Sequence, residues 1–406
     1  MQRDPEYATS SRTRLNRIGQ GRHFLQIPGP SPVPDRVLRA IDYPAIDHRG
    51  PEFQQLALRV LRGVGPIFGT TEPVVIYSGS GTGAWEAALM NTLSPGDSVL
   101  MHETGQFAGL WKRLAEKLQL KPDCIASDWR SPVDPDQVES RLRADSKGVI
   151  KAVCVVHNET STGVTSDIAA IRKAMDAARH PALLMVDCVS SLGAIDYRHD
   201  EWGVDVTVAG SQKGLMLPPG LGFNAVSAKA RAVAKTAGMP CGFWDWEDII
   251  ATNAQGFWPT TPNTNLLYGL AESIDMLMEE GLARVFARHQ QLALATRTAA
   301  EVWGMENVCL HPKACSPVVT ALLMPAKPDS TRYDADTLRR EALERYNISL
   351  GTGLGRLAGQ AFRIAHLGDT NALTIIGALA AVEMTLKALQ IPHRSGGVQA
   401  AMQVLT

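Results

Sequence analysis

Short runs of apolar, β-branched residues alternate with helix-patterned stretches along the first half of the chain. The apolar runs lie at residues 74–77, 99–102, 152–157, 182–187, 206–209 and 222–226. Helical patterns lie between them at 84–93, 108–118, 137–144 and 168–178, with helix N-cap candidates at 134–136 and 166–167. Alternating strands and helices predict right-handed crossovers and a mostly parallel sheet that is buried on both faces. Ligands of such sheets bind at the carboxyl ends of the strands, so we expect the chemistry just after these runs.

The pattern changes after about residue 270. A long helical pattern covers 266–303, and a sparser series follows with strands at 318–324 and 362–366 and helices at 335–345 and 372–389. We therefore predict an α/β fold with a second, smaller α+β domain. The predicted division is an N-terminal tail at 1–22, a segment at 23–50 that joins the small domain, a large domain at 51–280 and the small domain at 281–406.

Composition and charge argue against several classes of protein. Of the 406 residues, 45% are hydrophobic and 20% charged, and the net charge of −1 gives no electrostatic case for binding nucleic acid or an anionic membrane. No apolar run reaches the roughly 18–20 residues needed to span a bilayer. The six cysteines show no C-x-x-C pair and the ten histidines no H-x-x-x-H spacing. We therefore expect reduced thiols, a cytoplasmic protein and no metal site. The five arginines of the tail are expected to be solvated, with an organelle transit peptide as the alternative.

The first chemical signal is the glycine-rich segment 79–84, which follows a predicted strand and precedes a predicted helix. Backbone N–H groups and the helix dipole form an anion site at such a junction, and small residues let a phosphate approach. The segment also fits G-x-G-x-x-G/A, with Glu103 after the next strand, so a dinucleotide site is one interpretation. A tight structural turn is the other.

Two further signals follow buried strands. The strand at 182–187 ends in Asp187, which in isolation would be explained as a loop cap. The strand at 206–209 is followed by Lys213, flanked by small residues with an apolar segment behind it. A lysine in that setting has a lowered pKa and can act as an amine nucleophile. A phosphate cradle, a buried Asp and a buried Lys at neighbouring strand ends are what pyridoxal 5′-phosphate (PLP) requires.

At this point the chain resembles the class V, fold-type I aminotransferases, and most of all their serine–glyoxylate and alanine–glyoxylate branches. The resemblance runs from about residue 23 to the end. It rests on IPGPSPVP at 27–34, DHRGPEF at 47–53, SGTGAWEAALMNTLSPGD at 80–97, VVHNETSTGVTSDI at 155–168, HPALLMVDCVSS at 180–191, DEWGVDVTVAGSQKGLMLPPGLG at 200–222 and AFRIAHLGD at 361–369. It implies a large domain with a mostly parallel seven-stranded sheet and a smaller C-terminal α+β domain.

The resemblance assigns the cofactor-binding roles position by position. Lys213 matches the Schiff-base lysine, and Asp187 the partner of the pyridinium nitrogen. Phe107 matches the aromatic residue on the ring face, and Thr160 the hydroxyl near the phenolic oxygen. The phosphate cup is assigned to Ser80, Gly81, Thr82 and Gln212.

The same resemblance assigns substrate and interface roles. Arg363 matches the arginine that binds the substrate α-carboxylate, and Gly29 is assigned with it to substrate binding. Without the family, an ion pair inside a strand would be the simpler interpretation of Arg363. Thr261 matches a residue that reaches the phosphate bound by the other subunit of a homodimer. The implied substrates are small amino acids and 2-oxo acids.

The expected activity is transfer of the amino group of L-serine to glyoxylate, which gives hydroxypyruvate and glycine. Alanine or aspartate as the donor remains an alternative, because Thr260, Cys188 and Ala365 depart from the usual residues of this branch. A dicarboxylic donor would need a second cation, for which Arg49 and Arg356 are the candidates. The more remote alternatives are an NAD-dependent oxidoreductase that uses the 79–84 loop and a catalytically silent scaffold.

Overall fold

A computed structural model describes residues 21–406 of the chain. The other residues, 1–20, make up most of the predicted N-terminal tail, so that prediction lies outside the described residues. Within the described part, none of the helices is both long and apolar enough to cross a membrane.

The larger of two main sheets has seven strands in the order β2-β10-β9-β8-β5-β3-β4. All neighbours are parallel except β10, which runs antiparallel to both β2 and β9. Residues of β8, β9 and β10 are buried throughout, as expected for strands covered on both faces. The strands are β2 (Val74–Ser78), β3 (Ser98–His102), β4 (Lys121–Ile125), β5 (Ile150–Val156), β8 (Leu183–Asp187), β9 (Val206–Gly210) and β10 (Leu221–Val226).

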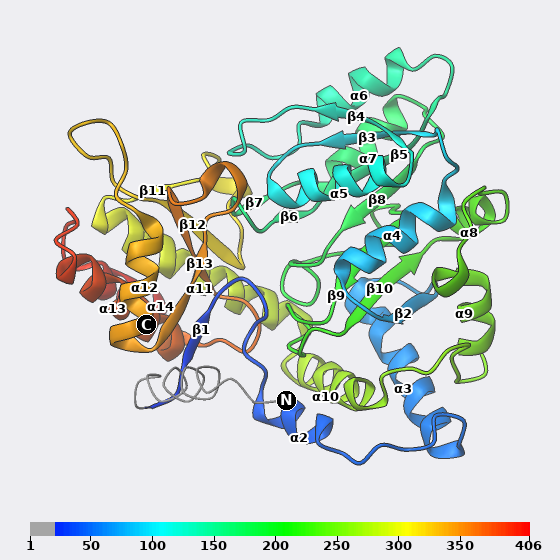
Figure 1. Cartoon of the computed structure of the whole chain (residues 1–406), viewed down its shortest axis with the longest axis horizontal. Helices are drawn as coiled ribbons and strands as arrows, with labels where there is room; N and C mark the ends of the chain where they lie inside the picture. The colour runs from blue at the N-terminus through cyan, green and yellow to red at the C-terminus, as the bar shows by residue number, and fades with distance from the viewer. Residues whose placement is uncertain (1–20) are drawn as a thin grey trace, which may run out of the picture.

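Helices cover both faces of this sheet and form two separate apolar cores with it (Figure 1). One core is completed by α4 (Gly81–Thr92), α5 (Gln106–Lys117), α8 (Ala228–Ala234) and α9 (Trp246–Asn253). The other is completed by α2 (Asp35–Ile41), α3 (Pro51–Phe68), α6 (Pro135–Ala144), α7 (Ile168–Ala177) and α10 (Thr264–Glu280).

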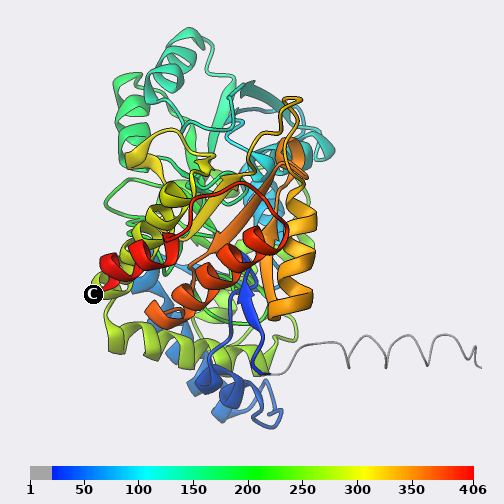
Figure 2. The same ribbon diagram turned by 90° about the vertical axis from the view of Figure 1, so that its left-hand side faces the viewer.

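The smaller sheet has five strands in the order β1-β13-β14-β12-β11, and the C-terminal helices pack over it (Figures 1 and 2). Its first strand comes from the N-terminal segment and pairs in parallel with β13. The strands are β1 (Phe24–Gln26), β11 (Glu306–Asn307), β12 (Val319–Leu323), β13 (Ile348–Thr352) and β14 (Ala361–Ala365). The helices are α11 (Leu282–Trp303), α12 (Ala335–Tyr346), α13 (Ala372–Ala388) and α14 (Gly397–Leu405). A two-stranded hairpin, β6 (Asn158–Glu159) and β7 (Val164–Thr165), lies between the two sheets (Figure 1).

The α/β class, the mostly parallel seven-stranded sheet and all six predicted strands of the large sheet are confirmed. Both predicted helix caps are also present, because the Asp134 side chain accepts the N–H of Asp136 and the Asp167 side chain that of Ala170. The seventh strand, β4, was missed because its sequence KPDCI combines a proline and charged residues, a composition tolerated at the edge of a sheet. The residue boundaries of the domains stay a prediction.

The prediction of one long helix over 266–303 is wrong. The structure divides it into α10 and α11 at Gly281, whose φ of +83° ends the first helix. Apolar periodicity continues across this break because both helices bury a face, so the pattern alone does not show the turn.

Candidate active site

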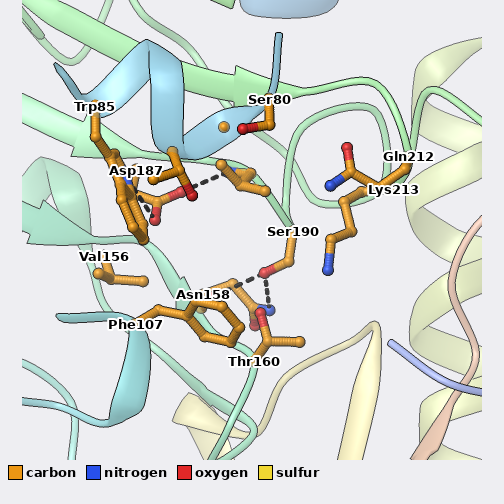
Figure 3. A pocket seen from close by; sticks show the side chains of 13 residues that line it. Ser80, Trp85, Phe107, Val156, Asn158, Thr160, Asp187, Ser190, Gln212 and Lys213 are labelled. Carbon is orange, nitrogen blue, oxygen red and sulfur yellow. Dashed lines mark hydrogen bonds between the residues drawn. The ribbon is translucent and has the colours of Figure 1, made fainter. Parts of the chain in front are cut away.

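Eight of the eleven predicted site residues follow the carboxyl ends of the strands and surround one cavity of about 110 Å³ (Figure 3), whereas Gly29, Thr261 and Arg363 do not line it. Five strands of the large sheet lead to it. The segment after β2 begins α4, β3 leads to Phe107 at the start of α5, β5 leads into the β6–β7 hairpin, β8 ends in Asp187, and β9 leads to Lys213. The lining residues are Ser80, Gly81, Thr82, Trp85, Phe107, Val156, Asn158, Thr160, Asp187, Val189, Ser190, Gln212 and Lys213.

The N-terminus of α4 opens on this cavity. Ser80 is the N-cap, and its hydroxyl accepts the N–H of Gly83 at 3.4 Å. The first N–H groups of a helix have no partner inside the helix and carry its positive dipole end, which suits an anion. The close approach requires small residues, because a Cβ on Gly81 would lie 2.5 Å from Val189 Cγ2. This edge of the cavity can hold a phosphate.

Asp187 is a buried carboxylate with two hydrogen bonds (Figure 3). Its Oδ1 accepts the N–H of Val189 at 2.7 Å, and its Oδ2 accepts the indole Nε1–H of Trp85 at 3.1 Å. Burial raises the pKa of Asp187 to about 7, with a smaller contribution in the same direction from Glu159. A cationic N–H group beside this buried carboxyl group would favour its charged form and lower its pKa again.

Lys213 enters the cavity from the segment after β9 (Figure 3). Its Nζ donates a hydrogen bond to the carbonyl oxygen of Pro28. Burial, helped by the charge of Arg363, lowers the pKa of Lys213 to about 8. Gly29 packs directly on this side chain: a Cβ there would lie 2.4 Å from Nζ. The structure thus places Gly29, predicted to bind substrate, against the lysine, and the substrate role itself stays a prediction.

Arg363, in β14 of the smaller sheet, is buried without an acidic partner among the described residues. Its Nε donates to the carbonyl of Thr352 at 2.8 Å, and its Nη1 to the carbonyl of Thr160 at 2.9 Å. Burial lowers the pKa of Arg363 to about 10. The alternative of a structural ion pair inside the strand is therefore wrong, and the unneutralised guanidinium is suited to a carboxylate ligand.

Glu159 joins the β6–β7 hairpin to the start of α5. It is fully buried, and its carboxylate accepts the N–H groups of Phe107 and Ala108 at 3.1 Å each. It also accepts the N–H and the hydroxyl of Ser161. This one side chain thereby fixes Phe107 relative to the hairpin that carries Thr160, two residues that line the cavity.

Several cavity residues were not predicted. Trp85 and Val189 hold the Asp187 carboxylate, and the amide Nδ2–H of Asn158 donates to the hydroxyl of Ser190 at 2.8 Å. Trp85 lies four residues after Gly81 on α4, so helical spacing from the glycine loop could have placed it near the site. The Asn158–Ser190 pair joins residues 32 positions apart and had no local signal.

Other candidates lie apart from the cavity. Thr261 is exposed in the segment before α10 and does not line it. His157, which directly follows β5, is buried and does not line the cavity, and its Nδ1 lies 3.0 Å from the Ser191 hydroxyl. Arg49 is exposed and contacts His48.

The last two candidates pair with each other. The guanidinium of Arg356 donates to Glu103 at 2.8 Å and stacks on Trp129. Glu103 also accepts the Trp129 indole N–H at 3.1 Å. The dinucleotide interpretation loses its basis here, since Glu103 is engaged and the strand before the glycine loop, β2, is an antiparallel edge strand.

The residues present fit PLP, a flat cationic ring that carries a phosphate. Gln212 lies at the end of the cavity where α4 begins, and its amide N–H₂ group can donate to a phosphate. Its buried Oε1 has no hydrogen-bond partner within residues 21–406. Gly210 keeps this end open, because a Cβ there would lie 3.0 Å from that oxygen and 3.4 Å from the Gly81 nitrogen. Asp187 lies across the cavity from Gln212, where it can meet a ring nitrogen, and Lys213 lies beside Gln212 with its amine available for the carbonyl carbon (Figure 3).

Comparisons with known proteins agree with this arrangement. The family model "Aminotransferase class-V" matches residues 23–324. A serine–glyoxylate aminotransferase of Arabidopsis thaliana is 45% identical, covering 95% of this chain and 96% of its own. An L-aspartate–glyoxylate aminotransferase of Paracoccus denitrificans is 42% identical, covering 93% and 94%. The solved pyridoxamine–pyruvate aminotransferase of Mesorhizobium loti superposes with a TM-score of 0.86 at 28% identity, covering 94% and 96%.

Proposed function

Because the chain belongs to the class V aminotransferases, which are PLP-dependent enzymes, we propose that it moves the amino group of L-serine to glyoxylate. The products are hydroxypyruvate and glycine. Its substrates are amino acids and 2-oxo acids, as for the family. The observation that carries the proposal is the juxtaposition of a buried amine, Lys213, and a buried carboxylate, Asp187, in one cavity that has a helix N-terminus at its edge.

PLP supplies an electron sink for the negative charge that develops when the Cα–H bond of the amino donor breaks. Ser80, Gly81, Thr82 and Gln212 would hold its phosphate, Phe107 its ring face and Asp187 its ring nitrogen. A negative Asp187 keeps a proton on that nitrogen and so strengthens the sink. Thr160 would donate its hydroxyl to the phenolic oxygen.

Lys213 is the group that binds the cofactor and moves the proton. With a pKa of about 8, a usable fraction of its amine is neutral near physiological pH and can act as a nucleophile. After the amino donor has displaced it, the same Nζ accepts the Cα proton and returns it one step later as a general acid. The carbonyl of Pro28, its hydrogen-bond acceptor, orients it between these steps.

Arg363 would bind the α-carboxylate of the donor and then the carboxylate of glyoxylate. Its two contacts to the carbonyls of Thr160 and Thr352 fix the guanidinium plane and leave it without a negative partner among the described residues. A bidentate pair with the substrate would orient Cα for proton removal.

The case for serine rests on the charges around this site. A second carboxylate on the donor would be buried without a cation, which is costly. Arg356, one candidate, already pairs with Glu103, and Arg49, the other, is exposed and does not line the cavity. L-Aspartate is the second candidate donor, because the relative from Paracoccus denitrificans carries that name.

A donor panel tests the proposal. We expect kcat/KM for L-serine to exceed that for L-alanine and L-aspartate, each measured with glyoxylate as the acceptor. An advantage of tenfold for aspartate, which is about 1.4 kcal/mol of transition-state binding, would overturn the serine assignment. The variant Arg356→Met should then abolish that advantage if Arg356 leaves Glu103 to bind the second carboxylate.

We also infer a homodimer with shared active sites, in which Thr261 reaches the phosphate of the other subunit. Its exposure outside the cavity of its own chain supports this role. Sedimentation at micromolar concentration should give a dimer, and a fully active monomer would refute the inference. A cytoplasmic location is supported by the six cysteines, all of which are free thiols.

A further inference from the structure

Two cysteines outside the cavity lie side by side in the loop between β11 and β12. The sulfurs of Cys309 and Cys315 each lie 3.5 Å from one acceptor, the carbonyl oxygen of His311, to which either thiol can donate. The two thiols are therefore close neighbours. The sequence pattern C-x₅-C did not indicate this pair, because the contact depends on the short 3₁₀ turn Pro312–Ala314 between them.

The surroundings of Cys315 stabilise a thiolate. The amide Nδ2–H of Asn307 donates to its sulfur at 3.4 Å, and the Arg297 side chain contributes positive charge. The neighbouring Cys309 thiol, with these two groups, lowers the pKa of Cys315 to about 7, whereas the pKa of the Cys309 thiol is raised. Cys309 is buried and Cys315 partly exposed, so an external reagent meets the more acidic thiol first.

A metal site is not a competing explanation for the pair. No cluster of three or more His, Cys, Asp or Glu side chains suited to a metal ion occurs in the part of the chain that the structure describes. The imidazole Nε2 of His311 is engaged with the Ser131 hydroxyl at 3.0 Å. Two thiols without further ligands are suited to redox chemistry instead.

We propose that Cys309 and Cys315 are a peroxide-reactive pair that forms a reversible disulfide. The Cys315 thiolate attacks a peroxide oxygen, the O–O bond breaks, and sulfenic acid and hydroxide (or alkoxide) form. The Cys309 thiol then attacks the sulfenic sulfur, the S–O bond breaks, and the S–S bond and water form. The peroxide is reduced by two electrons, and the two thiols are oxidised by two.

The pair is connected to the active site through the backbone. Cys315 forms an antiparallel bridge with Val164 of β7, and the N–H of Ser316 donates to the carbonyl of Gly163 at 2.9 Å. The same hairpin carries Thr160, whose carbonyl accepts Arg363. We therefore expect the disulfide to disturb carboxylate binding more than the chemical step, a consequence that rests on the proposed function.

Non-reducing peptide mapping of the holoenzyme after hydrogen peroxide treatment tests the disulfide. We expect the peptides that contain Cys309 and Cys315 to be linked, with the loss of two hydrogen atoms, and to separate after dithiothreitol. In Cys309→Ser, Cys315 should gain oxygen instead. Cys124→Ser is the matched control: Cys124 is also partly exposed, but burial raises its pKa, and its loss should leave the link unchanged. Both thiols remaining free to alkylate after peroxide treatment would overturn the proposal.

Kinetics on the same samples test the connection to the site. The oxidised enzyme should show KM for glyoxylate raised by about twofold or more with a smaller change in kcat, restored by dithiothreitol and absent in Cys309→Ser. A disulfide with unchanged KM would refute the connection alone. An enzyme that is inactive in both redox states would count against the proposed function, since the mapping result does not depend on activity.

Discussion

The buried carboxylate of Glu159 accepts the backbone N–H of Phe107 across 52 residues of sequence, at 3.1 Å. The Glu159 carboxylate thereby caps the N-terminus of α5, because the N-cap residue Gly105 has no side chain that could do so. No side chain would fit at Gly105, because a Cβ there would lie 2.5 Å from the Glu159 side chain. The hairpin and the helix are therefore held as one unit at the cavity wall.

Replacing Glu159 with Gln should reduce kcat/KM by about 10- to 100-fold, because the amide cannot accept all of these N–H donors and Phe107 shifts. Unfolding by denaturant should show a loss of about 1–3 kcal/mol. Glu383→Gln is the matched control, since Glu383 accepts the Trp303 indole and the N–H groups of Gly396 and Val398 in the smaller domain. It should lower stability similarly and leave kcat/KM unchanged. Equal kinetic losses in both variants would contradict the positioning role.

Replacing Lys213 with Ala should leave a folded protein that binds PLP without a covalent bond to it. Borohydride reduction of the wild-type holoenzyme, followed by peptide mass spectrometry, should place the cofactor on Lys213, the one amine buried in the cavity lining. The variant should lose activity by several orders of magnitude, since both the nucleophile and the proton carrier are absent. Label on another lysine would refute this assignment.

Replacing Gly29 with Ala should lower activity by about 100-fold or more, because the methyl group would lie 2.4 Å from Lys213 Nζ and displace it. The φ of +114° adds backbone strain. Gly304→Ala is the control: its φ of +78° is also positive, but nothing lies within 4 Å of the added carbon. That variant should lose about 1 kcal/mol of stability and no activity. An unchanged visible absorption spectrum of the bound PLP and an unchanged turnover in Gly29→Ala would contradict the close packing.

Asp187 should make the cofactor-free protein less stable as pH rises. Its pKa in the folded protein, about 7, lies above the ordinary value of 3.8, so the folded state binds the proton more tightly. The stabilisation is complete below about pH 4 and is lost between pH 4 and 7, amounting to a few kcal/mol at most. Denaturant titrations across this range should show the free energy of unfolding falling with pH in the wild type and falling less in Asp187→Asn.

In the holoenzyme, the Asp187→Asn variant should slow Cα deprotonation by several orders of magnitude. Near-normal turnover would make Asp187 only a loop cap.

Replacing Arg363 with Lys should raise KM for both serine and glyoxylate by about tenfold or more, with a smaller effect on kcat. The charge remains, but the bidentate geometry is lost. Arg339→Lys is the control, since Arg339 also donates to a strand carbonyl, that of Leu350, but its guanidinium is paired with Asp336 and is not free for a substrate. Steady-state kinetics with each substrate varied in turn will measure the effect. A rise in KM for only one of the two substrates would contradict a shared carboxylate site.

The sequence by itself determined six of the seven strands of the large sheet and two residues of the candidate active site. Mostly apolar runs of strand length indicate buried strands, since burial on both faces leaves few polar positions, and strand ends locate the site in this class of fold. Asp187 and Lys213 follow from that logic alone, because each lies at or just after the carboxyl end of a buried strand. The four residues of the phosphate cup could be assigned only with the family resemblance in addition to the glycine-rich loop.

Only the tertiary structure decided which distant groups meet. The contacts of Arg363 with Thr160 and of Gly29 with Lys213 each join segments more than 180 residues apart, and they depend on how the smaller sheet packs against the larger. The break at Gly281 was hidden for a related reason, because both helices bury apolar faces and the periodicity does not change. Local pattern reports whether a side chain is buried; the packing of the elements decides what lies beside it.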